Sequence, residues 1–277
     1  MNHIIQTDFT QLLNARYGGK PVAIDAVNQV IASMMNHRSV RAFTDQPISA
    51  GTLEQMMAAA QSASTSSNLQ TWSVVAVTDP ASKERLSQFV GHQAWVKSCP
   101  VFLVWLADLA RLESLGQSRG MPTESLEYIE MLLMATIDSA LAAQNAAVAA
   151  ESLGLGVVFI GGIRNQPEDV AKELGLPPRV FATFGMCLGY PDTARMSAIR
   201  PRLDQSAILH REKYDPTAYQ AATSAYNTVM DGFYTAQSMK PQGQWDVHSL
   251  KRVSGPKAMT GRDRLAAALK HLGFPLK

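Results

Sequence analysis

Runs of apolar residues separated by polar stretches predict a chain of alternating helices and strands. Apolar runs at about 73–78, 100–107, 156–160 and 182–188 have the length of strands. Two of them, Val101–Ala107 and Val157–Ile160, are continuous, as expected of buried central strands. The pattern therefore predicts a sheet that is covered on both faces.

The helical patterns are longer than the strands. A helix is expected over about Ala50–Ala63, after an N-cap signal at Ser49, and the longest one over Glu124–Leu153. Its second half, 138–151, is rich in alanine and apolar on most faces, so it should be buried all round. Such a helix lies either in the centre of the core or in an interface with a second subunit.

Three parts of the chain differ in character. Residues 1–24 form an N-terminal extension with a short helix at Phe9–Tyr17, and residues 25–235 form the main domain. Residues 236–277 form a basic C-terminal extension, because the last 27 residues hold seven Lys and Arg against one acid. A solvated basic face is the default interpretation of this extension, and attraction of a phosphorylated cosubstrate is the alternative.

Composition narrows the function classes. A chain of 277 residues, 46% hydrophobic, can bury a full core. Its net charge of only +2 argues against nucleic acid as a partner. Cys99 and Cys187 lie in apolar surroundings and are expected to be buried and reduced, and we find neither a secretory signal nor an uncharged apolar run of membrane-spanning length. A cytoplasmic protein is expected, without a metal, since the six histidines lack metal-ligand spacing.

Four segments carry candidate chemistry. His37-Arg38-Ser39-Val40-Arg41 places two guanidiniums, which suit phosphate oxygens, beside a hydroxyl. A hydroxyl-rich stretch follows at Ser62–Gln70, and Gly161-Gly162 comes at the end of a strand, where glycine permits close approach to a flat ligand. Arg200-Pro201-Arg202 is a second basic pair.

These segments, in this order, resemble the FMN-dependent nitroreductase family, in its type A branch of oxygen-insensitive NADPH nitroreductases and flavin reductases. The matching residues are 37–49, 64–70, 138–165 and 184–203, within a resemblance that runs from about 26 to 235. The resemblance implies an α+β, three-layer fold with a mixed, mostly antiparallel sheet flanked by helices. It also implies an obligate homodimer whose extensions embrace the partner subunit, with FMN bound at the seam.

The resemblance further implies the cofactor contacts. Arg38, Ser39, Arg200 and Arg202 would hold the FMN phosphate, and Arg41 would lie near flavin N1 and O2, where its charge raises the reduction potential. The remaining expected cofactor contacts are His37, Thr65, Gln93 at the pyrimidine edge, and Phe159, Ile160, Gly161 and Gly162 along the isoalloxazine.

The implied activity is hydride transfer from NADPH or NADH to a small aromatic acceptor, such as a nitroaromatic, a quinone or a flavin, in alternating half-reactions. No catalytic side chain is required, and Ser67 and Asn68 would border the open ligand face. One departure concerns the nucleotide: Gln237 stands where the family has an arginine for the 2′-phosphate, and Lys240 could supply only a point charge. A reductase less selective for NADPH is expected.

Two alternatives remain at this point. A flavin-binding protein without turnover would hold FMN that NAD(P)H does not bleach. A serine hydrolase is suggested by Gly116-Gln117-Ser118-Arg119-Gly120, which matches the G-x-S-x-G elbow. That motif needs a strand running directly into the serine, and the apolar run ends nine residues earlier.

Overall fold

A computed structural model describes residues 2–20, 22, 24–49, 51–241 and 243–277, with side chains from Phe9 onward. The chain divides into two compact units. The helical unit comprises the residues up to Arg38 together with Ser197–Met259, and the sheet unit comprises Ser39–Met196 and Thr260–Lys277. The predicted division at residues 24 and 235 stays a prediction.

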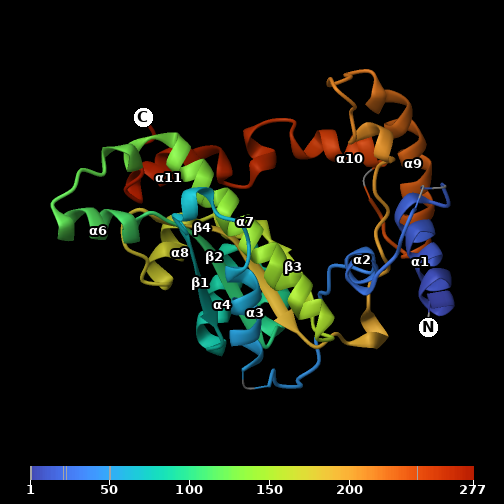
Figure 1. Ribbon diagram of the computed structural model, residues 1–277, viewed down its shortest axis with the longest axis horizontal. Coiled ribbons are helices and arrows are strands. Elements are labelled where there is room, and N and C mark those ends of the chain that lie inside the picture. The colour runs from blue at the N-terminus through green and yellow to red at the C-terminus, as the bar shows by residue number, and fades with distance from the viewer. Residues whose placement is uncertain (1, 21, 23, 50, 242) are drawn as a thin grey trace. The chain divides into compact units, whose positions relative to one another are not determined.

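The sheet unit contains four strands and seven helices among its described residues (Figure 1). The strands are β1 (Trp72–Val77), β2 (Val101–Asp108), β3 (Gly156–Ile160) and β4 (Val180–Gly189). The helices are α3 (Thr52–Gln61), α4 (Pro80–Phe89), α5 (Ala94–Ser98), α6 (Ala110–Arg119), α7 (Ile129–Ser152), α8 (Pro167–Glu173) and α11 (Leu265–His271).

The four predicted strands are confirmed, and they pair antiparallel in the order β1-β2-β4-β3. The expectation that both continuous apolar runs are central strands holds for β2 and is wrong for β3, which is an outer strand. β3 is nevertheless buried, because the segment after Arg38 runs beside it: Ser39 forms a parallel bridge to Val157, and the Val40 N–H donates to the Val157 carbonyl at 2.9 Å.

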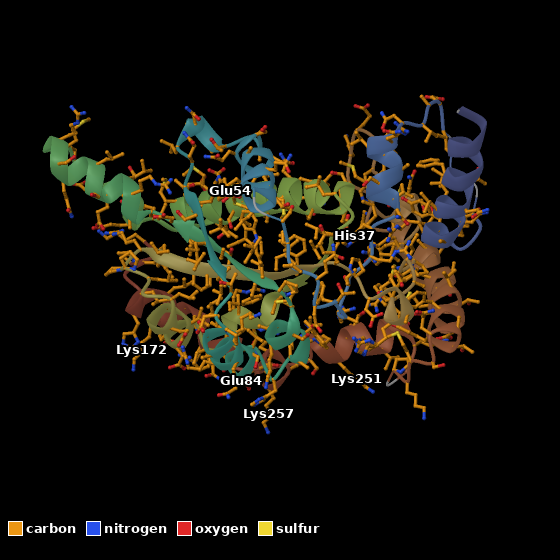
Figure 2. All side chains as sticks on the ribbon, turned by 90° about the horizontal axis from the view of Figure 1, so that it is seen from below. His37, Glu54, Glu84, Lys172, Lys251 and Lys257 are labelled. Atoms are coloured by element: carbon orange, nitrogen blue, oxygen red, sulfur yellow. The ribbon has the colours of Figure 1, made fainter. Side chains whose placement is uncertain are left out.

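Helices cover both faces of the sheet, as the predicted three layers require. Alternate residues of β2 point to opposite sides: Leu103 and Trp105 pack in one core with α3 and α7, whereas Phe102 and Val104 pack in another with α4 and α8. Figure 1 shows α3 beside α7. Figure 2 shows Glu84 and Lys172 on the outer surfaces of α4 and α8.

The sequence predicted that the alanine-rich half of α7 is buried on all sides. This prediction is wrong, because one face of the helix is exposed. Its alanine-rich half packs into the core of its own chain, where Ala142, Ala143, Ala146 and Ala147 are at most 1% exposed. An apolar stripe on another face stays exposed: Ile129, Leu133, Ile137 and Leu141, each four residues apart. By length and composition α7 could cross a membrane, but half of that window is buried, as in a core helix.

The C-terminal residues of the sheet unit pack on their own chain. Phe274 is 1% exposed in a cluster with Leu126 and Leu132, and Arg264 forms two hydrogen bonds to Glu168, at 2.7 and 2.8 Å. Part of the predicted basic surface is therefore neutralised locally. Both cysteines are free and buried, and burial raises the pKa of the Cys187 thiol well above its usual value, so it stays neutral.

The helical unit is built from α1 (Asn2–Tyr17), α2 (Gln29–Met35), α9 (Ala218–Ala236) and α10 (Trp245–Arg252). Its core is aromatic: Tyr226 and Tyr234 on α9 are buried around Met230. Trp245 lies edge-to-face on Tyr226 with ring centroids 4.9 Å apart. A cavity of about 720 Å³ opens beside this cluster.

Candidate functional site

The candidate residues fall into both units. Ten belong to the sheet unit: Ser39, Arg41, Thr65, Ser67, Asn68, Gln93, Phe159, Ile160, Gly161 and Gly162. Six belong to the helical unit: His37, Arg38, Arg200, Arg202, Gln237 and Lys240. Each unit is described by itself.

In the sheet unit, the turn after β3 brings Gly162 against the loop that carries Gln93. The chain leaves β3 at Ile160 and enters a 3₁₀ turn, Gly161–Arg164. A Cβ atom on Gly162 would lie 2.6 Å from the Val90 carbonyl oxygen and 3.0 Å from Gln93 Nε2. Only glycine permits this approach without a shift. The two candidate residues are therefore immediate neighbours, although they are far apart in the sequence.

The side chain of Gln93 is oriented by this loop, because its Nε2 donates to the Val90 carbonyl at 2.9 Å. Trp95 follows on α5, and the Arg41 guanidinium carbon lies 5.6 Å from its ring centroid, within cation–π range. Arg41 thus stands next to the helix that begins directly after Gln93. The buried indole N–H of Trp95 has no partner in the part of the chain that the structure describes.

At the end of β3, the side chain of Phe159 is exposed and that of Ile160 is buried. Phe159 is 38% exposed in an otherwise buried strand, held edge-to-face on Phe184 at 5.5 Å between centroids. Ile160 is 2% exposed, so only its backbone could meet a ligand. An exposed phenyl ring beside two glycines offers a planar molecule both an apolar contact and close backbone approach.

Arg164 is a cation of this turn that is not among the predicted site residues. Its guanidinium lies 3.5 Å from where a Gly161 Cβ would be and donates to the Thr183 carbonyl. Burial lowers the pKa of Arg164 from its ordinary value, and the positive charge of Arg262 lowers it further. Strands and turns that are far apart in sequence assemble this environment, so the sequence held no local signal for it.

The hydroxyl-rich loop is a second feature of the sheet unit. Ser67, Asn68 and Gln70 have φ of 48°, 54° and 51°, a left-handed conformation that is costly for residues other than glycine. The side chains of Ser67 and Asn68 are exposed, and Thr65 is half-buried. Strained backbone at exposed polar side chains is typical of ligand-binding loops.

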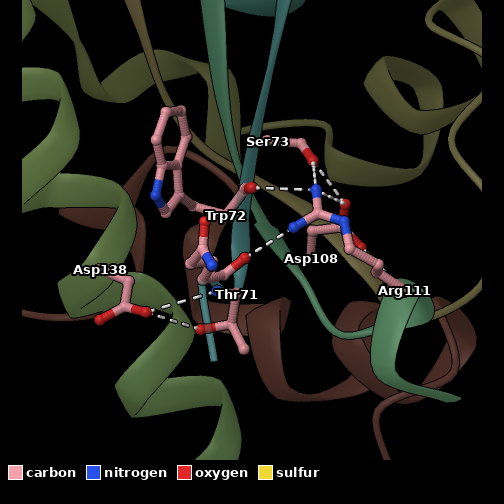
Figure 3. A network of polar contacts seen from close by, with 7 residues as sticks. Thr71, Trp72, Ser73, Asp108, Arg111 and Asp138 are labelled. Atoms are coloured by element: carbon pink, nitrogen blue, oxygen red, sulfur yellow. Dashed lines mark hydrogen bonds and ion pairs between the residues drawn. The ribbon is translucent and has the colours of Figure 1, made fainter. Parts of the chain in front are cut away.

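Polar contacts hold this loop in place (Figure 3). Asp138, only 2% exposed on α7, accepts hydrogen bonds from the Ser66 N–H at 3.1 Å and from the Thr71 hydroxyl at 3.1 Å. On the other side, Arg111 donates to the Gln70 carbonyl at 2.7 Å. Asp138 is not among the predicted site residues, although an acid inside an apolar helix is itself a signal of a buried polar partner.

The loop and the Gly161–Gly162 turn do not meet in one chain. The loop leads into β1 and the turn leaves β3, which are the two outer strands of the sheet. Three strand spacings separate them, about 14 Å.

In the helical unit, the structure brings the two basic segments together. The carbonyls of His37 and Arg200 both accept hydrogen bonds from the Arg16 guanidinium, at 2.9 and 2.8 Å. Arg38 turns back on Asn36, donating to Asn36 Oδ1 at 2.5 Å, and Arg200 lies 5.6 Å from the Phe233 ring centroid. Arg200 and Arg202 form no ion pair with a carboxylate in the described part of the chain.

Gln237 and Lys240, the two residues expected to contact the nicotinamide nucleotide, differ in their surroundings. Gln237 is the C-cap of α9, and its Oε1 accepts a hydrogen bond from the Ala198 N–H at 3.2 Å. It therefore helps to hold the segment that leads to Arg200. Lys240 is exposed.

The hydrolase alternative fails on geometry. Ser118 lies in the last turn of α6, and its hydroxyl donates to the Leu115 carbonyl at 2.9 Å. No strand runs into it, so the motif forms no nucleophile elbow. Among the described residues there is also no group of three or more potential metal ligands.

The residues present fit FMN on the structure's own terms. The close packing of Gly162 on Val90 and Gln93 brings backbone without a side chain beside an oriented amide, which suits the polar edge of a flat ring. In the helical unit, the Arg200 and Arg202 guanidiniums form no ion pair within the described residues, and Arg16 holds the His37 and Arg200 backbones together. These features suit a phosphate dianion.

Known proteins resemble this chain along most of its length. The sequence profile of the nitroreductase family matches residues 34–190, and the profile of its C-terminal domain matches residues 200–277. An FMN reductase (NADPH) of Bacillus subtilis is 39% identical over 75% of this chain and 84% of its own length. An oxygen-insensitive NADPH nitroreductase of Salmonella typhimurium is 36% identical over 80% of this chain and 90% of its own length.

The fold is shared as well. The structure of B. megaterium NfrA2 superposes with a TM-score of 0.85 at 32% identity, covering 91% of this chain and all of the other. Both profiles, both relatives and the three-layer sheet unit lead to one assignment. The chain belongs to the nitroreductase family, in the branch of NADPH-dependent nitroreductases and flavin reductases.

Proposed function

We propose that this chain is an FMN-dependent oxidoreductase that transfers hydride from a reduced nicotinamide nucleotide to nitroaromatics, quinones or flavins. The observation that carries the proposal is the packing of Gly162 against Val90 and Gln93, with the Arg41 guanidinium over the ring of nearby Trp95. This arrangement can accept a flat heterocycle, orient its polar edge and leave one face open. The relatives' names, FMN reductase (NADPH) and NADPH nitroreductase, support it.

The chemistry that FMN supplies when bound is hydride transfer between the nucleotide and the acceptor. The residues of this chain bind and orient. The Gln93 amide reads the pyrimidine edge, and Arg41 places a fixed positive charge there, which stabilises negative charge. Arg38, Ser39, Arg200 and Arg202 hold the phosphate, with His37 in the same segment, and Thr65 adds a hydroxyl. Glycine backbone at 161–162 would let the ring approach closely, and no side chain would have to act as a general acid or base.

The assembly follows from two features of the sheet unit. The Ser66–Gln70 loop and the Gly161–Gly162 turn lie at opposite outer strands, and α7 exposes the Ile129–Leu141 apolar stripe. We propose a homodimer in which the stripe is covered by the second copy and Ser67 and Asn68 complete its ligand face. The buried alanines of α7, which suggested a dimer from sequence, are accounted for by the chain's own core.

Nucleotide preference is a finer proposal. Gln237 brings no charge and is engaged with the Ala198 N–H, while Lys240 is a single exposed ammonium. An exposed pair with one lysine contributes about 1 kcal/mol at most. We propose that this enzyme uses NADH at a rate comparable to NADPH, in the cytoplasm.

FMN binding tests the proposal first. The purified protein should be yellow, and the apoprotein should bind FMN with one site per chain in a fluorescence titration. A colourless protein that takes up no FMN would refute it.

A further inference from the structure

The N-terminal helix α1 lies outside the part of the chain that the family profiles match, which begins at residue 34. It is nevertheless packed firmly within the helical unit. Phe9, Leu13 and Arg16 recur on one face and are 4%, 8% and 6% exposed. The chain then turns at Gly18, where a Cβ would lie 2.8 Å from Val229 on α9. The helix is therefore an integral part of this unit.

Arg16 is the unusual member of that face, because it is a buried cation. Its guanidinium donates to three backbone carbonyls: Arg200 at 2.8 Å, Met35 at 2.9 Å and His37 at 2.9 Å. In return the Arg16 carbonyl accepts the Arg202 N–H at 2.8 Å. A buried guanidinium is tolerated only when its donors are satisfied, and its planar fork imposes a fixed geometry on the acceptors.

These four hydrogen bonds join the end of α1 to two stretches of backbone, 35–37 and 200–202. The side chains that follow or belong to them, Arg38, Arg200 and Arg202, are the cations assigned to the FMN phosphate. Tyr17, the residue after Arg16, lines the same cavity of about 720 Å³ as Arg200 and Arg202. The end of α1 is thus linked to the basic segments in two ways: Arg16 forms hydrogen bonds with their backbone, and Tyr17 lines the same cavity as Arg200 and Arg202.

We propose that α1 is part of the FMN phosphate site, with Arg16 as a positioning residue that sets the spacing of the two basic segments. This rests on the proposed function, since it takes FMN as the ligand. Arg16 itself does not touch the phosphate. It keeps the two stretches of backbone at a separation from which the guanidiniums of Arg38, Arg200 and Arg202 reach one phosphate group. Less conformational entropy is therefore lost when the cofactor binds.

The test compares FMN with riboflavin, which has the same ring and no phosphate. Binding of each to the full-length apoprotein is measured by fluorescence titration for the wild type, Arg16→Met, Arg16→Lys and Leu13→Ala. Leu13→Ala is the matched control, because it loses buried contacts of the same helix face but none of the four hydrogen bonds. Thermal unfolding is recorded for every variant.

Arg16→Met should weaken FMN binding about tenfold or more while riboflavin binding changes little, because the three phosphate-binding guanidiniums lose the fixed spacing of their backbones. A lysine at position 16 cannot reach three carbonyls, so Arg16→Lys should bind FMN with an affinity between those of the wild type and Arg16→Met. If Arg16→Met does not fold, Arg16→Lys provides the test. Leu13→Ala should lower the unfolding temperature and keep the wild-type ratio of FMN to riboflavin affinity.

Two results would overturn the inference. One is that folded Arg16 variants keep the wild-type ratio of FMN affinity to riboflavin affinity, and the other is that Leu13→Ala lowers this ratio as much as the Arg16 variants do. If the wild type itself bound no FMN, the proposed function would fail and this inference with it, which is a distinct outcome.

Discussion

The arginines of the candidate site have different surroundings, and we expect different roles for them: Arg38 and Arg202 bind the phosphate, and Arg41 supplies charge near the flavin ring. Arg202 lines the cavity of the helical unit, whereas Arg41 lies over the Trp95 ring in the sheet unit. Arg38→Ala and Arg202→Ala should each weaken FMN binding by about 2 kcal/mol, as loss of a charge-assisted phosphate contact does. Arg41→Ala should bind FMN more nearly normally but be reduced more slowly by NAD(P)H.

Titration of the apoproteins and anaerobic stopped-flow reduction measure the two effects. If Arg41→Ala lost affinity like Arg202→Ala and kept its reduction rate, the division into phosphate anchor and charge near the ring would be wrong.

Gln237 carries the prediction on nucleotide choice. Gln237→Arg should introduce preference for NADPH, mainly through a lower KM, because a guanidinium suits the 2′-phosphate. Because the native side chain also accepts the Ala198 N–H, Gln237→Ala is the control for losing that bond. The comparison is the ratio of kcat/KM for NADPH to that for NADH. A wild type that already preferred NADPH by orders of magnitude would contradict the account.

The residues that sequence reasoning missed share a physical reason. Arg16 acts on backbone carbonyls, and Asp138 and Arg111 act largely on backbone N–H or C=O groups, which every sequence offers everywhere. The selected residues came instead from local clusters of chemistry, such as His37–Arg41. Only Asp138 had a visible signal, since a carboxylate in an apolar stretch of helix must find donors.

At the scale of elements, the apolar runs predicted all four strands: β2 and β4 are buried on both faces, and β1 and β3 are apolar although part of each is accessible. Strand order was not predictable from them: β3 is as apolar as a central strand because the Ser39–Val40 segment and both helical layers cover it. Helix α3 begins at Thr52 after Gly51, whose φ of 82° suits glycine, and not directly after the Ser49 signal. The hydroxyl of Ser49 bonds to Thr52 Oγ1 instead.

The Ser66–Gln70 loop should depend on its buried anchor. Asp138→Ala leaves the Ser66 and Thr71 donors without their acceptor, at a cost of about 2 kcal/mol in the free energy of unfolding. The loop should also exchange amide hydrogens faster, and KM for the acceptor should rise more than kcat falls.

Ser139→Ala is the matched control for that prediction, because Ser139 is buried on the same helix and bonds to Thr183, away from the loop. Denaturant unfolding and hydrogen exchange of peptides covering 64–71 measure the difference. Equal exchange of the loop in both variants would argue against Asp138 as its anchor.

At the scale of the whole molecule, the apolar stripe on α7 tests the assembly. Ile137→Glu places a charge on a side chain that is 57% exposed in one chain, so the monomer should fold. If the stripe is the dimer interface, this variant should become monomeric by light scattering and lose FMN, because an unpaired buried charge is costly. Ala147→Glu, at a position 1% exposed within the chain, should instead unfold the protein. An Ile137→Glu dimer that retains FMN would contradict the interface.

The central claim is that this chain carries out hydride transfer with bound FMN, and anaerobic reduction tests it most directly. Excess NADPH or NADH, added to the yellow protein in the absence of oxygen, should bleach the flavin absorbance, and a nitroaromatic or quinone should restore it. Bound flavin that neither nucleotide bleaches would show a flavin-binding protein without turnover and contradict the account.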